Sequence, residues 1–103
     1  WELPNAENLS YMFNHATAFD QNLGSWTLEK VTNMEEMLTN CGMKSKNYDA
    51  TLKGWAENAK TPNNIKLGAN SLVYSSAGKS AHKILTDSKG WTITGDSYNT
   101  SGN

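Results

Sequence analysis

The chain has 103 residues, which suits one domain with a modest core. Ten acidic and nine basic residues give a formal net charge of -1, and every basic residue is lysine. Balanced charge without arginine disfavours nucleic acid as a partner, because nucleic-acid sites are basic and favour the guanidinium group. The single cysteine excludes an internal disulfide. No apolar run approaches the roughly 18 residues of a membrane span, so direct membrane insertion is not expected.

The N-terminal part of the chain contains one pattern twice, at an offset of 25 residues. Residues 1–16 read WELPNAENLSYMFNHA, and residues 26–41 read WTLEKVTNMEEMLTNC. A fixed period of about 20–50 residues is typical of stacked units, each of which buries its apolar face against its neighbour. Residues 1–43 are therefore predicted to form two solenoid coils of about 25 residues.

Each copy is predicted to contain a short helix. In the first copy, apolar residues recur at i, i+3, i+4 and i+7 over residues 9–16, and the second copy repeats this spacing over 34–41. Such spacing is typical of an amphipathic helix. The linking stretch 17–26 is predicted to be extended, with Phe19 and Leu23 pointing inward.

Longer elements are expected beyond residue 44. The pattern predicts a helix over 49–59, a break at Thr61-Pro62-Asn63-Asn64 and a short strand over 65–69. A second helix is predicted over 75–87, capped near Ser75 or Ser76 and ended by Gly90, followed by a strand over 91–95.

The period is lost in this second half of the chain. Stacked-repeat proteins need an atypical terminal unit to cover the open end of the core. We therefore expect residues 44–96 to form an irregular C-terminal capping unit. Residues 97–103 read SYNTSGN and are predicted to be a polar tail that frays.

The tryptophans favour packing over ligand binding. Trp1 and Trp26 recur at the repeat period, and Trp55 takes the equivalent place in the third unit. Periodic aromatic residues are more often core than ligand platform, although an exposed indole would suit a sugar ring. Trp91 begins the last predicted strand and is less constrained by the pattern.

The reactive residue types form no catalytic or metal-binding pattern. Cys41 occupies the position of Ala16 in the repeat, a small buried slot where cysteine behaves as a hydrophobe. His15 and His82 are expected on the surface, and no His-x-x-x-His or Cys-x-x-Cys pair is present. The adjacent carboxylates Glu35-Glu36 would diverge on a helix. We therefore predict no catalytic residue, no metal and no cofactor.

Several stretches of the chain resemble a family of bacterial surface repeats. They are NLSYMFNHATAFDQNLGSW and VTNMEEMLTNCGM in the repeats, followed by NYDATLKGWAEN, KLGANSLVYSSAGKSAHKIL and GWTITGDS. The first two resemble the BspA-like, leucine-rich-repeat-related (DUF285) repeats, and the rest resembles the closing unit of such arrays. The resemblance implies an α/β repeat fold: a right-handed, leucine-rich-repeat-like solenoid fragment with short strands, short helices and an irregular C-terminal cap. It also implies an exported, cell-surface protein that acts in adhesion or protein binding.

The expected function is a non-enzymatic interaction or adhesion module on the bacterial surface. Outward side chains on the strand face would contact a protein or host-matrix partner, and the first candidates are Asp20, Asn22, Ser25 and Thr27. One alternative is a structural cap or spacer before an anchoring domain. A second alternative is a carbohydrate-binding module that presents an exposed tryptophan to a glycan.

The predicted helical faces imply a mutational test. If Met12 and Met37 both point into the core, Met12→Asp and Met37→Asp each unfold the chain. His15→Ala and His82→Ala should leave the thermal midpoint nearly unchanged, because surface substitutions have small effects. Equal tolerance of all four substitutions would show that the inward face is misassigned.

Overall fold

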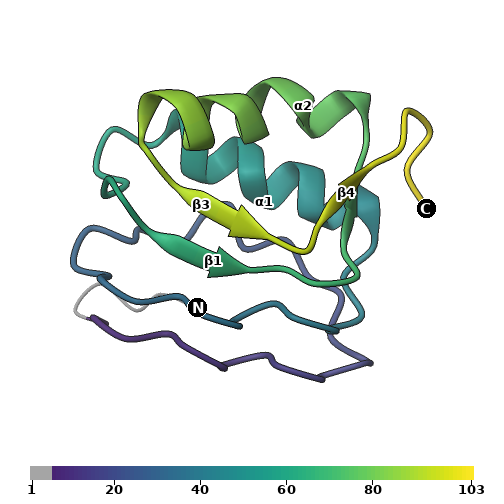
Figure 1. The fold of residues 1–103 in the computed structure, drawn as a ribbon, viewed down its shortest axis with the longest axis horizontal. Helices are drawn as coiled ribbons and strands as arrows, with labels where there is room; N and C mark the ends of the chain where they lie inside the picture. The colour runs from purple at the N-terminus through teal and green to yellow at the C-terminus, as the bar shows by residue number, and fades with distance from the viewer. Residues whose placement is uncertain (1–5) are drawn as a thin grey trace.

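The structure, a computed structural model, describes residues 6–103. Short strands and turn-rich segments run in parallel, and two helices pack against each other along one side of them (Figure 1). In chain order the elements are α1 (Ser45–Glu57), β1 (Lys66–Gly68), β2 (Val73–Tyr74), α2 (Ser76–Lys83), the π-helical turn η1 (Ile84–Ser88), β3 (Thr92–Thr94) and β4 (Ser97–Tyr98).

Four segments stack side by side in parallel, and we call this arrangement the ladder. Its segments are residues 8–15, 33–40, 66–74 and 92–99. The first two are joined by a bridge between Asn8 and Asn33, at the 25-residue offset of the sequence repeat. The second and third are joined by a bridge between Met34 and Leu67. Strand β1 then pairs with β3, and β2 pairs with β4.

The prediction of helices over 9–16 and 34–41 is wrong, because both segments consist of consecutive turns. Within the first segment, the amide of Met12 donates to the carbonyl of Leu9 at 3.2 Å, three residues back. The intervening amide of Tyr11 donates instead to Glu35 in the next segment, at 2.9 Å. Every second amide therefore closes a turn, while the others join the ladder.

Backbone torsions show why a helix cannot form in these segments. Tyr11 and His15 have φ values of 62° and 60°, and Glu36 and Asn40, 25 residues later, have 56° and 58°. These values lie in the left-handed region, which an α-helix of L-residues does not use. A left-handed residue at every fourth position produces four-residue turns, and their apolar spacing resembles that of a helix.

The C-terminal elements largely match their predictions. Helix α1 begins at Ser45, four residues before the predicted start, and strands β1 and β3 lie within the predicted ranges. The predicted helix over 75–87 is found as α2 continued by η1. Ser75 caps it by accepting a hydrogen bond from the amide of Ala77, and Gly90 follows it with φ of 69°.

The prediction of a frayed tail is wrong. Ser97–Tyr98 forms β4, which pairs in parallel with β2. Beyond it, the amide of Asn103 donates to Ser45 Oγ at 2.8 Å, and Asn103 Oδ1 accepts from the amide of Ser45 at 2.7 Å. The tail therefore caps the start of α1, a role that its polar composition did not reveal.

Trp26 and Trp55 lie in the core, as the repeat predicts, and Trp91, which the pattern does not constrain, lies there too. All three are buried, while Trp1 lies outside the described residues. The indole N–H of Trp55 donates to the carbonyl of Leu23 at 3.0 Å, and that of Trp91 donates to Pro62 at 2.8 Å. The indoles of Trp55 and Trp91 thus stabilise connecting segments with their polar edges as well as filling space.

The two repeat methionines differ in burial. Met37 is 0% exposed, whereas Met12, expected to be inward, is 37% exposed. The segment of Met37 has ladder neighbours on both sides, at residues 8–15 and 66–71. The segment of Met12 has a described neighbour on one side only, so the inward assignment of Met12 is wrong.

This difference changes the expected effect of the methionine substitutions. Met37→Asp should unfold the domain, because a buried carboxylate costs several kcal/mol and total stability is about 5–15 kcal/mol. Met12→Asp should lower the thermal midpoint by only a few degrees, because its carboxylate can reach water. Thermal unfolding followed by circular dichroism distinguishes the two; a folded Met37→Asp variant would contradict the ladder.

Candidate interaction surfaces

Two of the four sequence-predicted binding residues are used inside the fold. Asp20 Oδ1 accepts hydrogen bonds from the amide of Lys44 at 2.9 Å and from Asn47 Nδ2 at 3.0 Å. These two bonds, chiefly the one from Lys44, hold the pKa of Asp20 below its ordinary value. Asn22 Oδ1 accepts from the amide of Gly24 at 2.7 Å and closes a turn. Asp20 therefore ties the linking segment to the start of α1.

The other two predicted binding residues, Ser25 and Thr27, form no comparable side-chain hydrogen bond with the backbone in the described part of the chain. Ser25 is exposed and Thr27 is half-buried. All four residues lie in the connection between the first two ladder segments, which contains no strand, so they do not form the expected strand face. A binding role for them stays a prediction.

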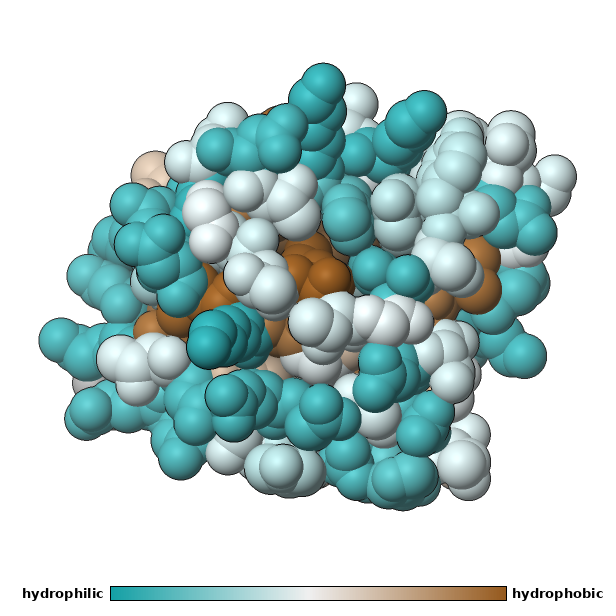
Figure 2. All heavy atoms as spheres, in the orientation of Figure 1, coloured by the Kyte–Doolittle hydropathy of each residue, from teal (hydrophilic) through white to brown (hydrophobic). Residues whose placement is uncertain are grey.

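A groove opens on the ladder itself, and we call it the ladder groove. Its volume is about 340 Å³, and its lining residues are Tyr11, Glu35, Glu36, Lys66, Leu67, Gly68 and Thr94. Tyr11 is 59% exposed. Figure 2 shows a mostly hydrophilic face with a band of hydrophobic residues near its centre, whereas most of the residues that line the ladder groove are polar.

The groove arises where the ladder register is uneven. The amide of Gly68 donates to the carbonyl of Met34, and the carbonyl of Gly68 accepts from the amide of Leu38. Gly68 therefore bonds to both ends of the turn that runs from Met34 to Leu38. Glu35 and Glu36 lie between these two points; Glu35 is exposed and Glu36 is half-buried. A side chain on Gly68 would meet the backbone of Glu36 at 2.4 Å, so glycine permits this close approach.

The carboxylates of the ladder groove are unpaired within the described part of the chain. Across residues 6–103 the one ion pair joins His82 and Asp96. Glu35 and Glu36 therefore have no cationic partner among those residues, although Lys66 lines the same groove. They offer two acceptor groups beside an exposed aromatic ring.

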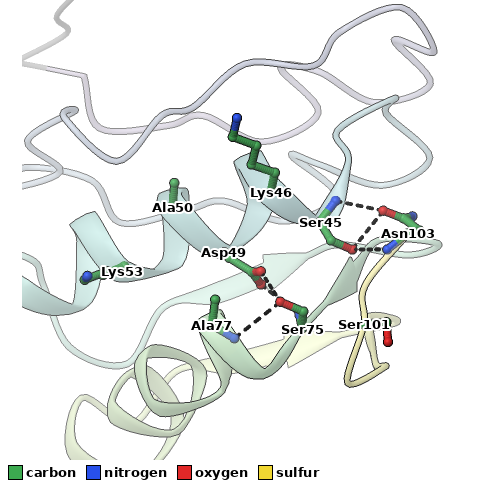
Figure 3. A pocket seen from close by; sticks show the side chains of 9 residues that line it. All are labelled: Ser45, Lys46, Asp49, Ala50, Lys53, Ser75, Ala77, Ser101 and Asn103. Carbon is green, nitrogen blue, oxygen red and sulfur yellow. Dashed lines mark hydrogen bonds between the residues drawn. The ribbon is translucent and has the colours of Figure 1, made fainter.

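A second hollow, the helix cleft, lies between α1, the start of α2 and the C-terminal tail (Figure 3). Its volume is about 470 Å³, and its lining residues are Ser45, Lys46, Asp49, Ala50, Lys53, Ser75, Ala77, Ser101 and Asn103.

Hydrogen bonds fix the polar groups of the cleft. Asp49, which is buried, accepts from the Ser75 amide at 2.8 Å through Oδ1 and from the Ser75 hydroxyl through Oδ2. The Ser45 hydroxyl faces the carbonyl of Val73 at 2.7 Å and Asn103 Oδ1 at 2.8 Å, and its single proton serves one of them at a time. These residues join α1 to α2 and to the tail.

A partly buried network that sequence reasoning missed surrounds Asp96. Its Oδ2 accepts from the Tyr48 hydroxyl at 2.6 Å and lies 3.0 Å from His82 Nε2, and the His82 ring stacks on Tyr74 at 4.2 Å. The expectation of a solvated His82 is therefore wrong, and His82→Ala should lower the thermal midpoint instead of leaving it unchanged. Burial, with the nearby charge of Asp96, raises the pKa of Tyr48 well above its ordinary value, so its hydroxyl remains a donor.

A sequence signal for this network did exist. Tyr48, Tyr74 and Tyr98 are separated by 26 and 24 residues, close to the repeat period, and Tyr74 and Tyr98 are ladder partners. Within residues 6–103, His82 hydrogen-bonds to Asp96 and to no nucleophile. The network joins both helices to the turn between β3 and β4.

Cys41 is buried, as predicted. Burial raises the pKa of its thiol, which disfavours the reactive thiolate. In the part of the chain that the structure describes, no group of three or more His, Cys, Asp or Glu side chains could hold a metal ion. A search of the same residues found no helix with the length and apolar character needed to cross a bilayer.

Comparison with known families identifies the class of protein. Residues 1–72 match the model of a family described as Mycoplasma protein of unknown function, DUF285. Because this match covers more than half of the chain, the chain belongs to the DUF285 family, whose repeats its sequence resembles. Neither a curated protein nor a solved structure matches it.

The lowered pKa of Asp20 predicts a pH-dependent contribution to stability. Both hydrogen bonds favour the ionised carboxylate, so the contribution is complete above the ordinary pKa of 3.8 and is lost as the pH falls through the lower folded-state value. Thermal midpoints of the wild type and Asp20→Asn should therefore converge between neutral pH and about pH 2.5.

The matched control is Glu29→Gln, which removes an equal charge from an exposed residue. Its difference from the wild type should change little over this interval. A wild-type and Asp20→Asn difference that is constant from neutral to acid pH would contradict the assignment.

Proposed function

We propose that this DUF285 chain is a non-enzymatic protein-interaction module of a bacterial cell surface, which binds its partner through the ladder groove. The proposal rests chiefly on one observation: the exposed ring of Tyr11 lies beside Glu35 and Glu36, which have no ion-pair partner among residues 6–103. Exposed tyrosines are enriched at the anchor positions of protein interfaces, where they bury a large apolar area and keep one polar contact.

The ladder supports a solenoid architecture as part of this proposal. Its first two segments stack at the repeat offset, and the next segments continue in parallel. We take residues 1–43 as two coils of a right-handed, leucine-rich-repeat-like solenoid, 44–96 as its C-terminal cap and 97–103 as a tail docked on that cap. The surface location rests on the sequence resemblance.

The partner is proposed to be a protein or a host-matrix component. A glycan is less well supported, because Trp26, Trp55 and Trp91 are buried and present no flat indole face. A structural cap or spacer is the second candidate. It is favoured by the packing of α1 against α2 and by the hydrogen bonds that join Tyr48 of α1 to Asp96 and the tail residue Asn103 to Ser45.

The proposal can be tested with a panel of immobilised host-matrix proteins and a glycan array. The wild type should bind at least one protein, and Tyr11→Ala should weaken that binding about tenfold, a typical loss at an interface anchor. Glu35→Gln should weaken it by a smaller factor. Circular dichroism checks that the variants remain folded.

Two matched controls lie outside the ladder groove. Glu29→Gln removes an equal charge, and Tyr98→Ala removes another exposed tyrosine, so both should retain binding. Binding that survives Tyr11→Ala would exclude the groove as the contact surface. Binding to no protein would favour the cap or spacer, and binding to glycans alone would favour the carbohydrate alternative.

A further inference from the structure

The helix cleft differs in charge from the ladder groove and shares no lining residue with it. Its rim carries Lys46 and Lys53, which project from α1 on either side of Ala50 (Figure 3). Both lysines are exposed, and neither forms an ion pair within residues 6–103. The cleft is therefore a hollow edged by two unpaired cations.

The one carboxylate of the cleft does not neutralise this rim. Both oxygens of Asp49 accept hydrogen bonds from Ser75, and the side chain is buried. Neither ammonium group lies within ion-pair distance of it. Two exposed positive charges thus outnumber one covered negative charge, so the surface favours an anionic ligand.

The floor of the cleft is small and fixed. Ala50 and Ala77 leave room above it, and the bonds of Ser45 to Asn103 hold the tail in place at one end. At about 470 Å³ the hollow falls within the range of ligand pockets, roughly 300–1,000 Å³. A fixed floor lowers the cost of ordering the site when a ligand binds.

The spacing of the lysines indicates the form of the ligand. They are seven residues apart on one helix, and at 1.5 Å per residue their backbone positions are roughly 10 Å apart along its axis. Carboxylates two or four residues apart in an extended peptide lie on the same face and are separated by roughly 7 or 13 Å. Flexible lysine side chains can adjust to this range.

We infer that the helix cleft binds an extended acidic peptide segment, with one carboxylate at Lys46 and another at Lys53. The exposed ion pairs are individually weak, so affinity should be near millimolar and should fall with added salt. The inference does not depend on the ladder groove, because the two hollows share no lining residue.

The test is a titration of the folded protein with a capped hexapeptide that carries glutamate at positions two and four, which share one face of an extended chain, followed by amide chemical shifts. The amides of Ser75 and Ala77, in the cleft, should shift. The same peptide with glutamine at both positions should cause no saturable shift. Tyr11→Ala should leave the titration unchanged, which separates this result from failure of the ladder groove.

Charge-matched variants decide whether the site is specific. Lys46→Gln/Lys53→Gln should weaken binding about threefold or more, and Lys30→Gln/Lys60→Gln, with the same net charge, should not. All four lysines are exposed, so both variants should fold. Equal weakening by the two variants, or no preference for the glutamate peptide, would overturn the inference.

Discussion

The structure depends on how backbone amides are shared between turns and ladder. In the segment that contains Leu9 and Phe13, alternate amides close turns within the segment, and the others donate to the next segment. No such segment can satisfy its backbone alone, since half of these amides need a neighbour. Packing and hydrogen bonding therefore favour the same arrangement, in which segments align at the repeat offset and bury one apolar row.

The same constraint explains which predictions from sequence hold. The 25-residue repeat predicts the register of Asn8 and Asn33, because equivalent residues meet when equivalent segments stack. The prediction of helices over 9–16 and 34–41 fails because an α-helix and a series of four-residue turns place apolar residues at nearly the same spacing. Leu9 and Phe13 are buried by four-residue turns as they would be by a helix, and only the positive φ of Tyr11 and His15 distinguishes the two. Asparagine and histidine tolerate that conformation, whereas tyrosine and glutamate give no such indication in sequence.

The candidate surfaces were harder to predict than the elements. Asp20 and Asn22 are predicted to be binding residues because they are polar and lie beside inward-pointing residues. Their side-chain oxygens instead accept hydrogen bonds from the backbone amides of Lys44 and Gly24. In the Asp96 network, His82 is 14 positions and Tyr48 is 48 positions from Asp96 along the chain. A sequence pattern does not reveal contacts of that range. Both grooves also depend on absent or small side chains: Gly68 in one, Ala50 and Ala77 in the other.

The uneven charge of the sequence has a structural counterpart. Residues 1–43 hold six acidic residues and one lysine, while 44–103 hold eight lysines and four acidic residues. The two sets do not neutralise each other: the carboxylates of the ladder groove and the lysines of the helix cleft form no ion pairs within residues 6–103. Under the two proposals, an anionic ligand would favour the helix cleft over the ladder groove, where two carboxylates face one lysine. Under the same proposals, selection between ligands of the same charge would depend on the shapes of the two hollows, which Tyr11 helps to set on the ladder and the Asp49–Ser75 pair between the helices.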